Sequence, residues 1–309
     1  MDYKKLKIIG KSLYQIHIPK EMKRYLVFLG RCYLHQKEIT ALFAFFAKTT
    51  LRERLLAGNP SFVEQVTRGF FYKEAGWSER IALVENHIRH LEKVGTPEFL
   101  EKLYCTHEPV ELWKDEFQEQ QLSLALWFHG GQRKEGCLSL VLRLGKEDLY
   151  QIMFWLAPGL NAAEPALWIG ALQGAQQGNA IIKALTKHYF GYRTKNLIFY
   201  GMRSVAEILG CKNIYAVTND GYYAMNHVRL DRKLKTSFSD FWEECGGTLC
   251  TDNRFYVIPI EESRKEMSEL KPSKRANHRR RYELMDGITA AMAISLSPYL
   301  NKRKTSDSL

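Results

Sequence analysis

Two histidines and a tyrosine have the residue types and settings for proton transfer. His227 and Tyr222 belong to a polar stretch that begins at residues 218–220, directly after an apolar run typical of a strand. Functional sites are commonly built on such loops at strand ends. His188 lies beside a glycine near the end of a predicted helix. Either imidazole can act as a general base near neutral pH, and the alternative for both is a structural or solvated histidine.

The acidic pair Glu243 and Glu244 is a second candidate, either as a general base or as a ligand for a cationic group. The alternative is a short helix that starts at Ser239 or the next residue, buries the aromatic residues 241–242 and ends at the glycines 246–247. Serine and aspartate cap the first turn of a helix, and glycine commonly ends one. In that case the two carboxylates lie on a solvated helix face.

Three glycines at four-residue spacing, Gly170, Gly174 and Gly178, allow a ligand to approach the backbone closely. Together with Gln177 they precede a predicted helix, and amide groups at a helix N-terminus attract anions. Gly174, Gln177 and Gly178 are therefore candidates for binding the phosphates of a cofactor. The same spacing equally suits a strand that bends or a tightly packed loop.

Six cysteines are spread along the chain without a CxxC pair. Neither Cys32 with His35 nor Cys105 with His107 has the paired-ligand pattern of a zinc site. We therefore expect reduced, buried thiols and no bound metal.

The net charge of +11 indicates attraction to an anionic partner. Basic residues gather in segments 4–24, 187–195, 229–235 and 274–285. Nucleic acid is the less favoured partner, because the sequence has no helix-turn-helix, zinc-finger or RNP-like signature. An anionic membrane surface or envelope component makes better use of the charge, since each Lys or Arg near such a surface contributes on the order of 1 kcal/mol.

Hydrophobic runs are too short for a membrane-spanning helix, which needs roughly 18 to 20 apolar residues. The basic start of the chain also lacks the apolar segment and cleavage site of a signal peptide. We therefore expect a cytoplasmic protein that is peripheral at the inner membrane.

Apolar residues recur every three or four positions over residues 21–103, which predicts helices. Short runs of Leu, Ile, Val and aromatic residues then predict three or four antiparallel strands within 122–175, with a hairpin turn at 145–148. Two helices that meet at Gly191, followed by two further strands, complete the pattern.

The expected fold class is α+β, with a helical N-terminal region followed by a mixed, mostly antiparallel sheet and flanking helices. Residues 1–110 form the predicted helical region, and residues 111–265 form the predicted sheet core. A basic helix and a polar tail are expected in residues 266–309.

Several short motifs between Ala166 and Gly247 follow one another in a recognisable order: a glutamine-glycine strand end, a Thr-Lys helix, a Gly-x-Arg turn and a Phe-Trp-x-Glu-x-Gly-Gly ending. The residues that carry them are Gln173–Gly174, Thr186–Lys187, Gly191 with Arg193, and Phe241–Trp242 with Glu244 and Gly246–Gly247. With the basic run 274–285, this pattern resembles the VirK/YbjX family of Gram-negative bacteria. The proline expected after the Gly-x-Arg turn is replaced by Thr194. The resemblance implies a role in virulence and in resistance to cationic antimicrobial peptides, through the cell envelope.

The order of elements also resembles acyltransferases of the GNAT type, in which a strand splays from its neighbour and a glycine loop binds the donor pyrophosphate. This resemblance implies acyl-CoA or acyl carrier protein as the donor, and no metal. The implied site has phosphate contacts at Gly174, Gln177 and Gly178, an anion contact at Arg193 or Lys195, and proton transfer by His227, Tyr222 or Glu243. The rival hypothesis is a non-enzymatic accessory factor that binds an envelope or virulence protein through its helical N-terminal half.

Overall fold

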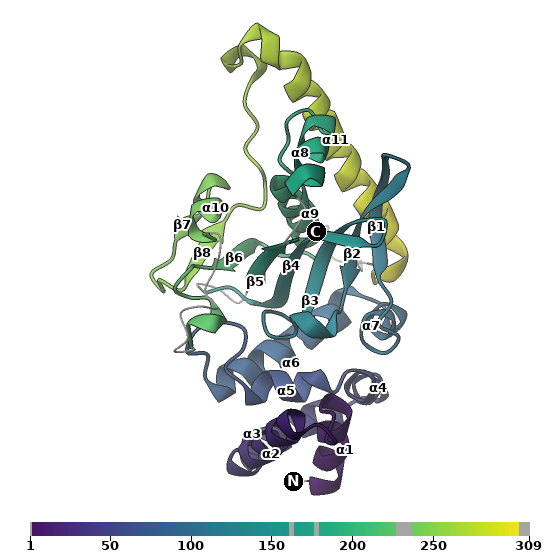
Figure 1. Cartoon of the computed structure of the whole chain (residues 1–309), viewed down its shortest axis with the longest axis vertical. Helices are drawn as coiled ribbons and strands as arrows, with labels where there is room; N and C mark the ends of the chain where they lie inside the picture. The colour runs from purple at the N-terminus through teal and green to yellow at the C-terminus, as the bar shows by residue number, and fades with distance from the viewer. Residues whose placement is uncertain (1, 161–163, 176–178, 227–236, 303–309) are drawn as a thin grey trace, which may run out of the picture.

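The computed structural model describes residues 2–160, 164–175, 179–226 and 237–302. Helices come first and occupy the lower half of Figure 1. They are α1 (Tyr3–Leu13), α2 (Pro19–Leu34), α3 (Gln36–Phe46), α4 (Thr50–Gly58), α5 (Ser61–Thr67), α6 (Trp77–Val94) and α7 (Pro97–Tyr104). The prediction of a helical region ahead of the sheet is confirmed.

Local sequence signals set the starts of several of these helices. Thr49 and Thr96 accept hydrogen bonds from backbone amides in the first turns of α4 and α7. Glu79 accepts a hydrogen bond from the backbone amide of Gly76 at 2.5 Å, so α6 begins at Trp77. Each cap satisfies amides that a helix cannot pair internally.

The sheet has the strand order β1-β2-β3-β4-β5-β6-β8-β7 among the described residues. The strands are β1 (Val110–Phe117), β2 (Gln120–Trp127), β3 (Leu138–Leu144), β4 (Glu147–Pro158), β5 (Pro165–Gly174), β6 (Asn213–Val217), β7 (Thr248–Leu249) and β8 (Phe255–Ile258). All neighbours are antiparallel except β5 and β6, which are parallel. The predicted hairpin turn joins β3 to β4, with Gly145 at a φ of +55°. The α+β class with a mixed, mostly antiparallel sheet is therefore confirmed.

The parallel pair β5–β6 separates partway along β5. Residues 166–169 pair with residues 213–216, and β5 then continues to Gly174 with β4 as its only paired neighbour among the described residues. Gly170 is skipped in the pairing with β4. Such an extra residue is a β-bulge, which bends a strand and increases its twist. The two parallel strands therefore part at the bulge.

The remaining helices flank the sheet. They are α8 (Asn179–His188), α9 (Thr194–Ile208), α10 (Ser239–Glu244) and α11 (Pro272–Leu296), with short 3-10 helices η1 (Gly130–Gln132), η2 (Tyr223–Asn226), η4 (Met267–Glu269) and η5 (Ser297–Tyr299). In Figure 1, α6 packs on β4 from below and α9 packs on β3 and β4 from above. The predicted helix boundary at Gly191 is confirmed, because this glycine follows α8 with a φ of +77°. Apolar side chains from the helices and the sheet join in one core.

Candidate active site

A buried carboxyl group lies where β5 and β6 separate. Glu135, in the loop between η1 and β3, has only 4% of its surface exposed. Its Oε1 accepts hydrogen bonds from Tyr222 Oη at 3.1 Å and from Gln173 Nε2 at 3.3 Å. Gln173 is near the end of β5, and Tyr222 follows β6 in the chain. The carboxyl group therefore connects the two strands beyond their last paired residues.

The surroundings of Glu135 favour a group that changes charge near neutral pH. Burial raises the pKa of Glu135 to about 7, because removal from water disfavours the carboxylate, while the hydrogen bond from Tyr222 and the charge of Lys134 oppose this rise. Burial and the nearby Glu135 charge raise the pKa of Tyr222 above its usual value, so the phenol stays protonated. A base whose pKa is close to the working pH is well suited to proton transfer.

The loop that carries Glu135 crosses directly over the sheet. A Cβ atom at Gly170 would overlap the carbonyl oxygen of Glu135, and a Cβ atom at Gly136 would overlap the backbone of Phe154. The amide of Cys137 donates a hydrogen bond to the Phe154 carbonyl at 2.9 Å. Because only residues without a side chain fit at these two crossings, the glycines hold the carboxyl group at the bulge.

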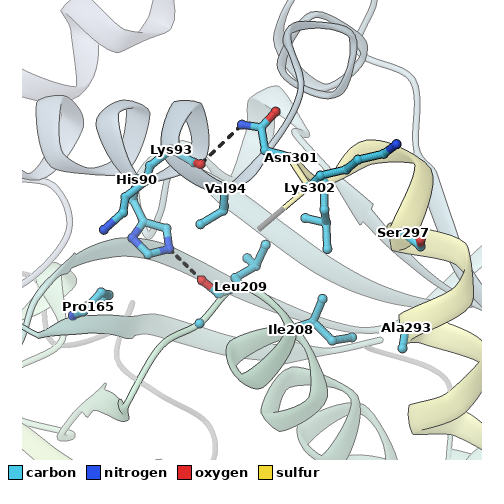
Figure 2. A pocket seen from close by; sticks show the side chains of 12 residues that line it. His90, Lys93, Val94, Pro165, Ile208, Leu209, Ala293, Ser297, Asn301 and Lys302 are labelled. Atoms are coloured by element: carbon cyan, nitrogen blue, oxygen red, sulfur yellow. Dashed lines mark hydrogen bonds between the residues drawn. The ribbon is translucent and has the colours of Figure 1, made fainter. Parts of the chain in front are cut away.

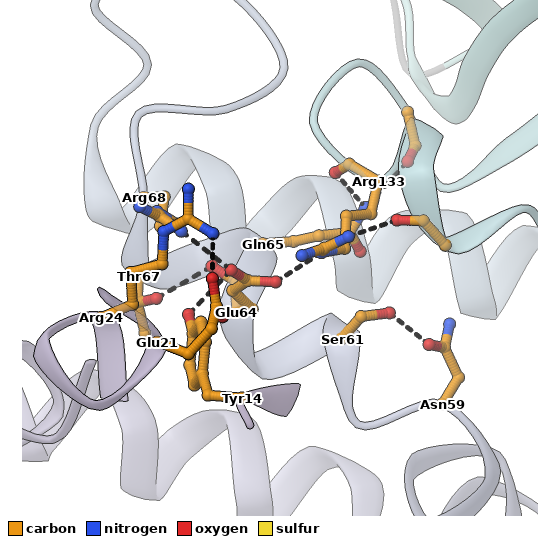
Figure 3. Close-up of polar contacts among 12 residues, drawn as sticks. Tyr14, Glu21, Arg24, Asn59, Ser61, Glu64, Gln65, Thr67, Arg68 and Arg133 are labelled. Atoms are coloured by element: carbon orange, nitrogen blue, oxygen red, sulfur yellow. Dashed lines mark hydrogen bonds and ion pairs between the residues drawn. The ribbon is translucent and has the colours of Figure 1, made fainter. Parts of the chain in front are cut away.

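Helix α5 holds the same loop from the N-terminal side (Figure 3). Gln65 Nε2 donates hydrogen bonds to the carbonyl oxygens of Arg133 at 2.9 Å and Gly136 at 2.8 Å. The fully buried carboxylate of Glu64 forms an ion pair with Arg133 and accepts a hydrogen bond from Tyr14 at 2.7 Å. The backbone on both sides of the candidate base is thus fixed by the helical region.

The segment between α5 and α6 joins the loops from the two sides of the site. The amide of Phe71 donates to the Lys134 carbonyl at 2.8 Å, and the amide of Lys73 donates to the Gly221 carbonyl at 2.8 Å. The residue between them forms an antiparallel bridge with Tyr222. Phe71 has a φ of +71°, a rare conformation for a bulky residue that these contacts hold in place.

Of the described residues expected to transfer protons, Tyr222 alone lies against the buried carboxyl group. His188 ends α8, where its exposed ring packs edge-on against Phe117 with ring centres 5.2 Å apart. Glu243 is exposed on α10 and accepts a hydrogen bond from Tyr256 at 2.6 Å. The short helix considered as the alternative for this segment is present, with its two aromatic residues buried.

The candidate cofactor residues that the structure describes lie near the end of β5 and the start of α9. Gly174 ends β5 beside the ring of Tyr150. Burial raises the pKa of Tyr150 and the charge of Arg193 opposes this rise, so the guanidinium of Arg193 acts on the same strand end. Lys195 Nζ lies 3.8 Å from the centre of the Phe241 ring, and burial lowers the pKa of Lys195.

Three further candidates, Gln177, Gly178 and His227, lie outside the described residues. The amide of Ala175, the residue after β5, donates to the Leu149 carbonyl at 2.9 Å. This amide therefore extends the pairing between β4 and β5 and does not bind an anion.

Sequence reasoning missed Glu135. The residue belongs to the run Gly130–Gly136, whose glycines and charged side chains are typical of a solvated turn. Two glycines could have pointed to this residue. Gly136 follows an acidic residue between two apolar strands, and Gly170 lies inside a third strand. Glycine inside or beside a strand often marks close approach of another backbone.

A cavity of about 920 Å³ lies elsewhere, between α6, the end of α9 and the C-terminal part of α11 (Figure 2). His90 Nε2 is hydrogen-bonded to the Leu209 carbonyl at 2.9 Å, and burial lowers the pKa of His90. Asn301 Nδ2 donates to the Lys93 carbonyl at 3.3 Å. The first contact joins α6 to the end of α9, and the second joins the C-terminal segment to α6, so both polar groups already have structural partners. We therefore assign the candidate chemistry to Glu135.

All six cysteines are free, and burial raises the pKa of Cys32 and Cys211 to about 12. Within the described ranges, no three His, Cys, Asp or Glu side chains gather as a metal site. None of the helices that the structure describes combines the length and the apolar character needed to cross a bilayer.

The sequence matches a known family along most of its length. The family described as "Protein of unknown function (DUF535)" matches residues 17–294. YbjX of Escherichia coli (strain K12) is 31% identical over 171 residues, which cover 50% of this chain and 52% of that protein. A Haemophilus influenzae protein is 24% identical over 275 residues, which cover 86% of this chain and 88% of that protein. No solved structure matches. The chain is therefore a member of the DUF535 family, and its resemblance to the VirK/YbjX family is confirmed.

Proposed function

We propose that this protein is an acyltransferase that modifies an envelope component or a protein at the cytoplasmic face of the inner membrane. The acyl donor in this proposal is acyl-CoA or acyl carrier protein. The observation that carries it is Glu135, a buried carboxyl group with a pKa near 7 where two parallel strands part. A connection with virulence and antimicrobial-peptide resistance is proposed from the family resemblance.

Glu135 and Tyr222 have complementary roles in this mechanism. The carboxylate of Glu135 accepts a proton from the attacking amine or hydroxyl, which forms a bond to the thioester carbonyl carbon. The carbon-sulfur bond then breaks, and Glu135 gives the proton to the leaving thiolate, so the carboxylate recovers its starting state. The hydroxyl of Tyr222 stays protonated and orients the carboxyl group through their 3.1 Å hydrogen bond.

The edge of β5 supports the proposed position of the donor. In the described structure the segment from Gly170 to Gly174 has no pairing with β6, and its last two residues are exposed, so an extended ligand would pair with the backbone of Gln173 and Gly174. Arg193 lies near the end of this edge, where its exposed guanidinium is ion-paired with the exposed Glu244. A phosphate of the donor would take the place of that carboxylate, because a guanidinium binds phosphate oxygens well. An anionic donor with an extended tether therefore suits this part of the molecule.

The rival function is an accessory factor without catalysis that binds an envelope or virulence protein. One observation favours it: α1 and α2, in the helical half, expose large apolar side chains. The two functions differ in whether the chain binds a thioester donor at all.

The test measures donor binding and acyl transfer in three forms of the full chain. Acetyl-CoA and long-chain acyl-CoA should each be titrated against wild type, Glu135→Gln and Glu116→Gln while thermal unfolding is followed. Saturable stabilisation by a donor is expected in all three, because a ligand of the native state stabilises it by mass action. Release of free thiol from that donor, with candidate acceptors present, should fall by about 100-fold or more in Glu135→Gln only.

Glu116 is the matched control because its side chain is exposed on the edge strand β1. If no donor stabilises the wild-type chain, the result contradicts the acyltransferase function and favours the accessory-factor function. If donors bind but Glu135→Gln releases thiol as fast as wild type, Glu135 is not the base.

A further inference from the structure

The first two helices expose an unusual number of large apolar side chains. Among the described residues, ten large hydrophobic side chains are exposed, and seven of these lie between residues 3 and 34. The seven are Tyr3, Ile8, Ile18, Leu26, Val27, Tyr33 and Leu34. Leu34 is 77% exposed and Leu26 is 58% exposed. Single exposed apolar residues are normal on a protein surface, but a contiguous group marks an interaction site.

Four of these side chains, at positions 26, 27, 33 and 34, form an outward-facing stripe on α2. The inner face of this helix buries Tyr25, Phe28 and Cys32 against the core. Leu26 and Tyr33 are seven residues apart, and the exposed pair Val27 and Leu34 has the same spacing. Residues seven apart in a helix lie on nearly the same face. Helix α2 therefore has apolar side chains on its inner face and on its outer face. The outer face lies at the end of the molecule that α1 to α3 form (Figure 1).

Helix α1 extends the stripe. The ring centre of Tyr3 lies 6.4 Å from that of Tyr33, so an aromatic pair joins the two helices at the surface. Ile8 is 69% exposed on α1, whose buried side chains are Leu6 and Ile9. We call the exposed residues 3, 8, 18, 26, 27, 33 and 34 the outer stripe.

The segment that carries the outer stripe is rich in positive charge. Between residues 2 and 34 the sequence has eight Lys or Arg residues and two acidic residues, a net +6 of the chain's +11. The two acidic groups are already engaged: Asp2 caps α1 by accepting from the amide of Lys5, and Glu21 forms an ion pair with Arg24. Lys23 is exposed on α2, three residues before Leu26.

We propose that the outer stripe docks on an anionic phospholipid surface, with α1 and α2 lying in the plane of the headgroups. Leu, Val and Ile side chains would enter the boundary of the acyl chains, and the two tyrosines would lie at headgroup level, where aromatic rings are favoured. The long Lys and Arg side chains would reach lipid phosphates.

The charge distribution favours lipid over a second copy of the chain and over nucleic acid. In a symmetric dimer the same patch would face itself, so two groups of net +6 would repel each other. Nucleic acid would use the positive charge but would leave the aliphatic stripe without a partner. A lipid surface satisfies both the apolar and the cationic groups.

The test is flotation of the full chain with vesicles of phosphatidylcholine, with and without phosphatidylglycerol. Binding to the anionic vesicles is expected, and added salt should weaken it. The double variant Leu26→Ser with Leu34→Ser should lose binding by about tenfold or more, because two apolar anchors are removed. Ile294→Ser is the matched control, since Ile294 is 74% exposed on α11. Thermal unfolding of each variant shows that the fold is kept.

Four outcomes would overturn this proposal. The first is equal flotation of the double variant and wild type, and the second is no binding of wild type to anionic vesicles. The third is a wild-type dimer in solution that the double variant abolishes, which would assign the outer stripe to a second copy. Loss of binding in an Arg279→Ser, Arg280→Ser variant but not in the double variant would assign lipid contact to α11. None of these measurements depends on acyl transfer.

Discussion

The protonation state of Glu135 affects the stability of the fold. Its pKa is about 7 in the folded chain, against an ordinary value of 4.5. Between these two pH values the folded state binds more protons than the unfolded state, so the free energy of unfolding falls as pH rises. Above the folded pKa the effect levels off, at a total of about 3 kcal/mol.

Replacement of Glu135 by glutamine tests this pH dependence. An amide has no proton to lose, so Glu135→Gln should gain stability relative to wild type between about pH 5 and about pH 8, by up to about 3 kcal/mol. Urea denaturation at both pH values measures the change. The control Glu116→Gln changes an exposed residue, so its free energy of unfolding should differ from that of wild type by the same amount at both pH values. A Glu135→Gln difference that does not change with pH would mean that the carboxyl group has an ordinary pKa.

The hydrogen bond from Tyr222 also affects this pKa. It lowers the pKa of Glu135, because it stabilises the carboxylate. Tyr222→Phe removes the donor and should move the pKa of Glu135 upward, as followed by carbon NMR of the glutamate carboxyl. Tyr256→Phe removes a comparable hydrogen bond, which Tyr256 donates to Glu243, and should leave the pKa of Glu135 unchanged. An unchanged or lower pKa in Tyr222→Phe would contradict the assigned contact.

At the scale of helices and strands, local signals predicted most of the elements. The hairpin between β3 and β4 follows from alternation and a turn glycine, and the helix boundary at Gly191 follows from a left-handed glycine. Strand β1 was not predicted. Its sequence, Val110–Phe117, contains four charged residues, because an edge strand exposes part of its surface to solvent.

The β-bulge gives a prediction for one strand. Gly170→Ala would place a methyl group against the Glu135 carbonyl, so the loop or β5 must move, at a cost of about 1 to 3 kcal/mol. Gly287→Ala is the control, because a Cβ atom there meets open space within α11 and should stabilise the helix by about 0.5 to 1 kcal/mol. Denaturant unfolding of both variants makes the comparison. Equal stabilities would show that the loop does not press on β5.

At the scale of the whole molecule, the candidate site could not be predicted, because its parts are far apart in the sequence. Gln65, Glu135, Gln173 and Tyr222 belong to four separate segments. Each has an ordinary local context, and only the strand order and the crossing over Gly170 bring them together. Tyr222 was predicted because it follows a strand, which is a local feature.

The predicted boundaries at residues 110 and 265 divide the chain into a helical region, a sheet core and a C-terminal segment. Contacts across the first boundary indicate that the helical region and the sheet core unfold as one cooperative unit. His87 of α6 accepts a hydrogen bond through Nδ1 from the amide of Leu156 in β4, at 3.1 Å. Glu64 of α5 is paired with Arg133 beside the sheet, and breaking such a buried pair costs about 3 to 5 kcal/mol. The helical region and the sheet therefore stabilise each other.

Two spectroscopic probes can distinguish one unit from two. Five of the six tryptophans lie between residues 113 and 242, so fluorescence reports mainly on the sheet and the elements that cover it. Far-ultraviolet circular dichroism reports mainly on the helices, most of which precede the sheet. We expect the two unfolding curves in urea to coincide, because the helices cannot leave β4 without exposing its core face. A helical transition at clearly lower urea would instead mean that the N-terminal half unfolds alone, and that Glu135 keeps its place without the contacts from α5.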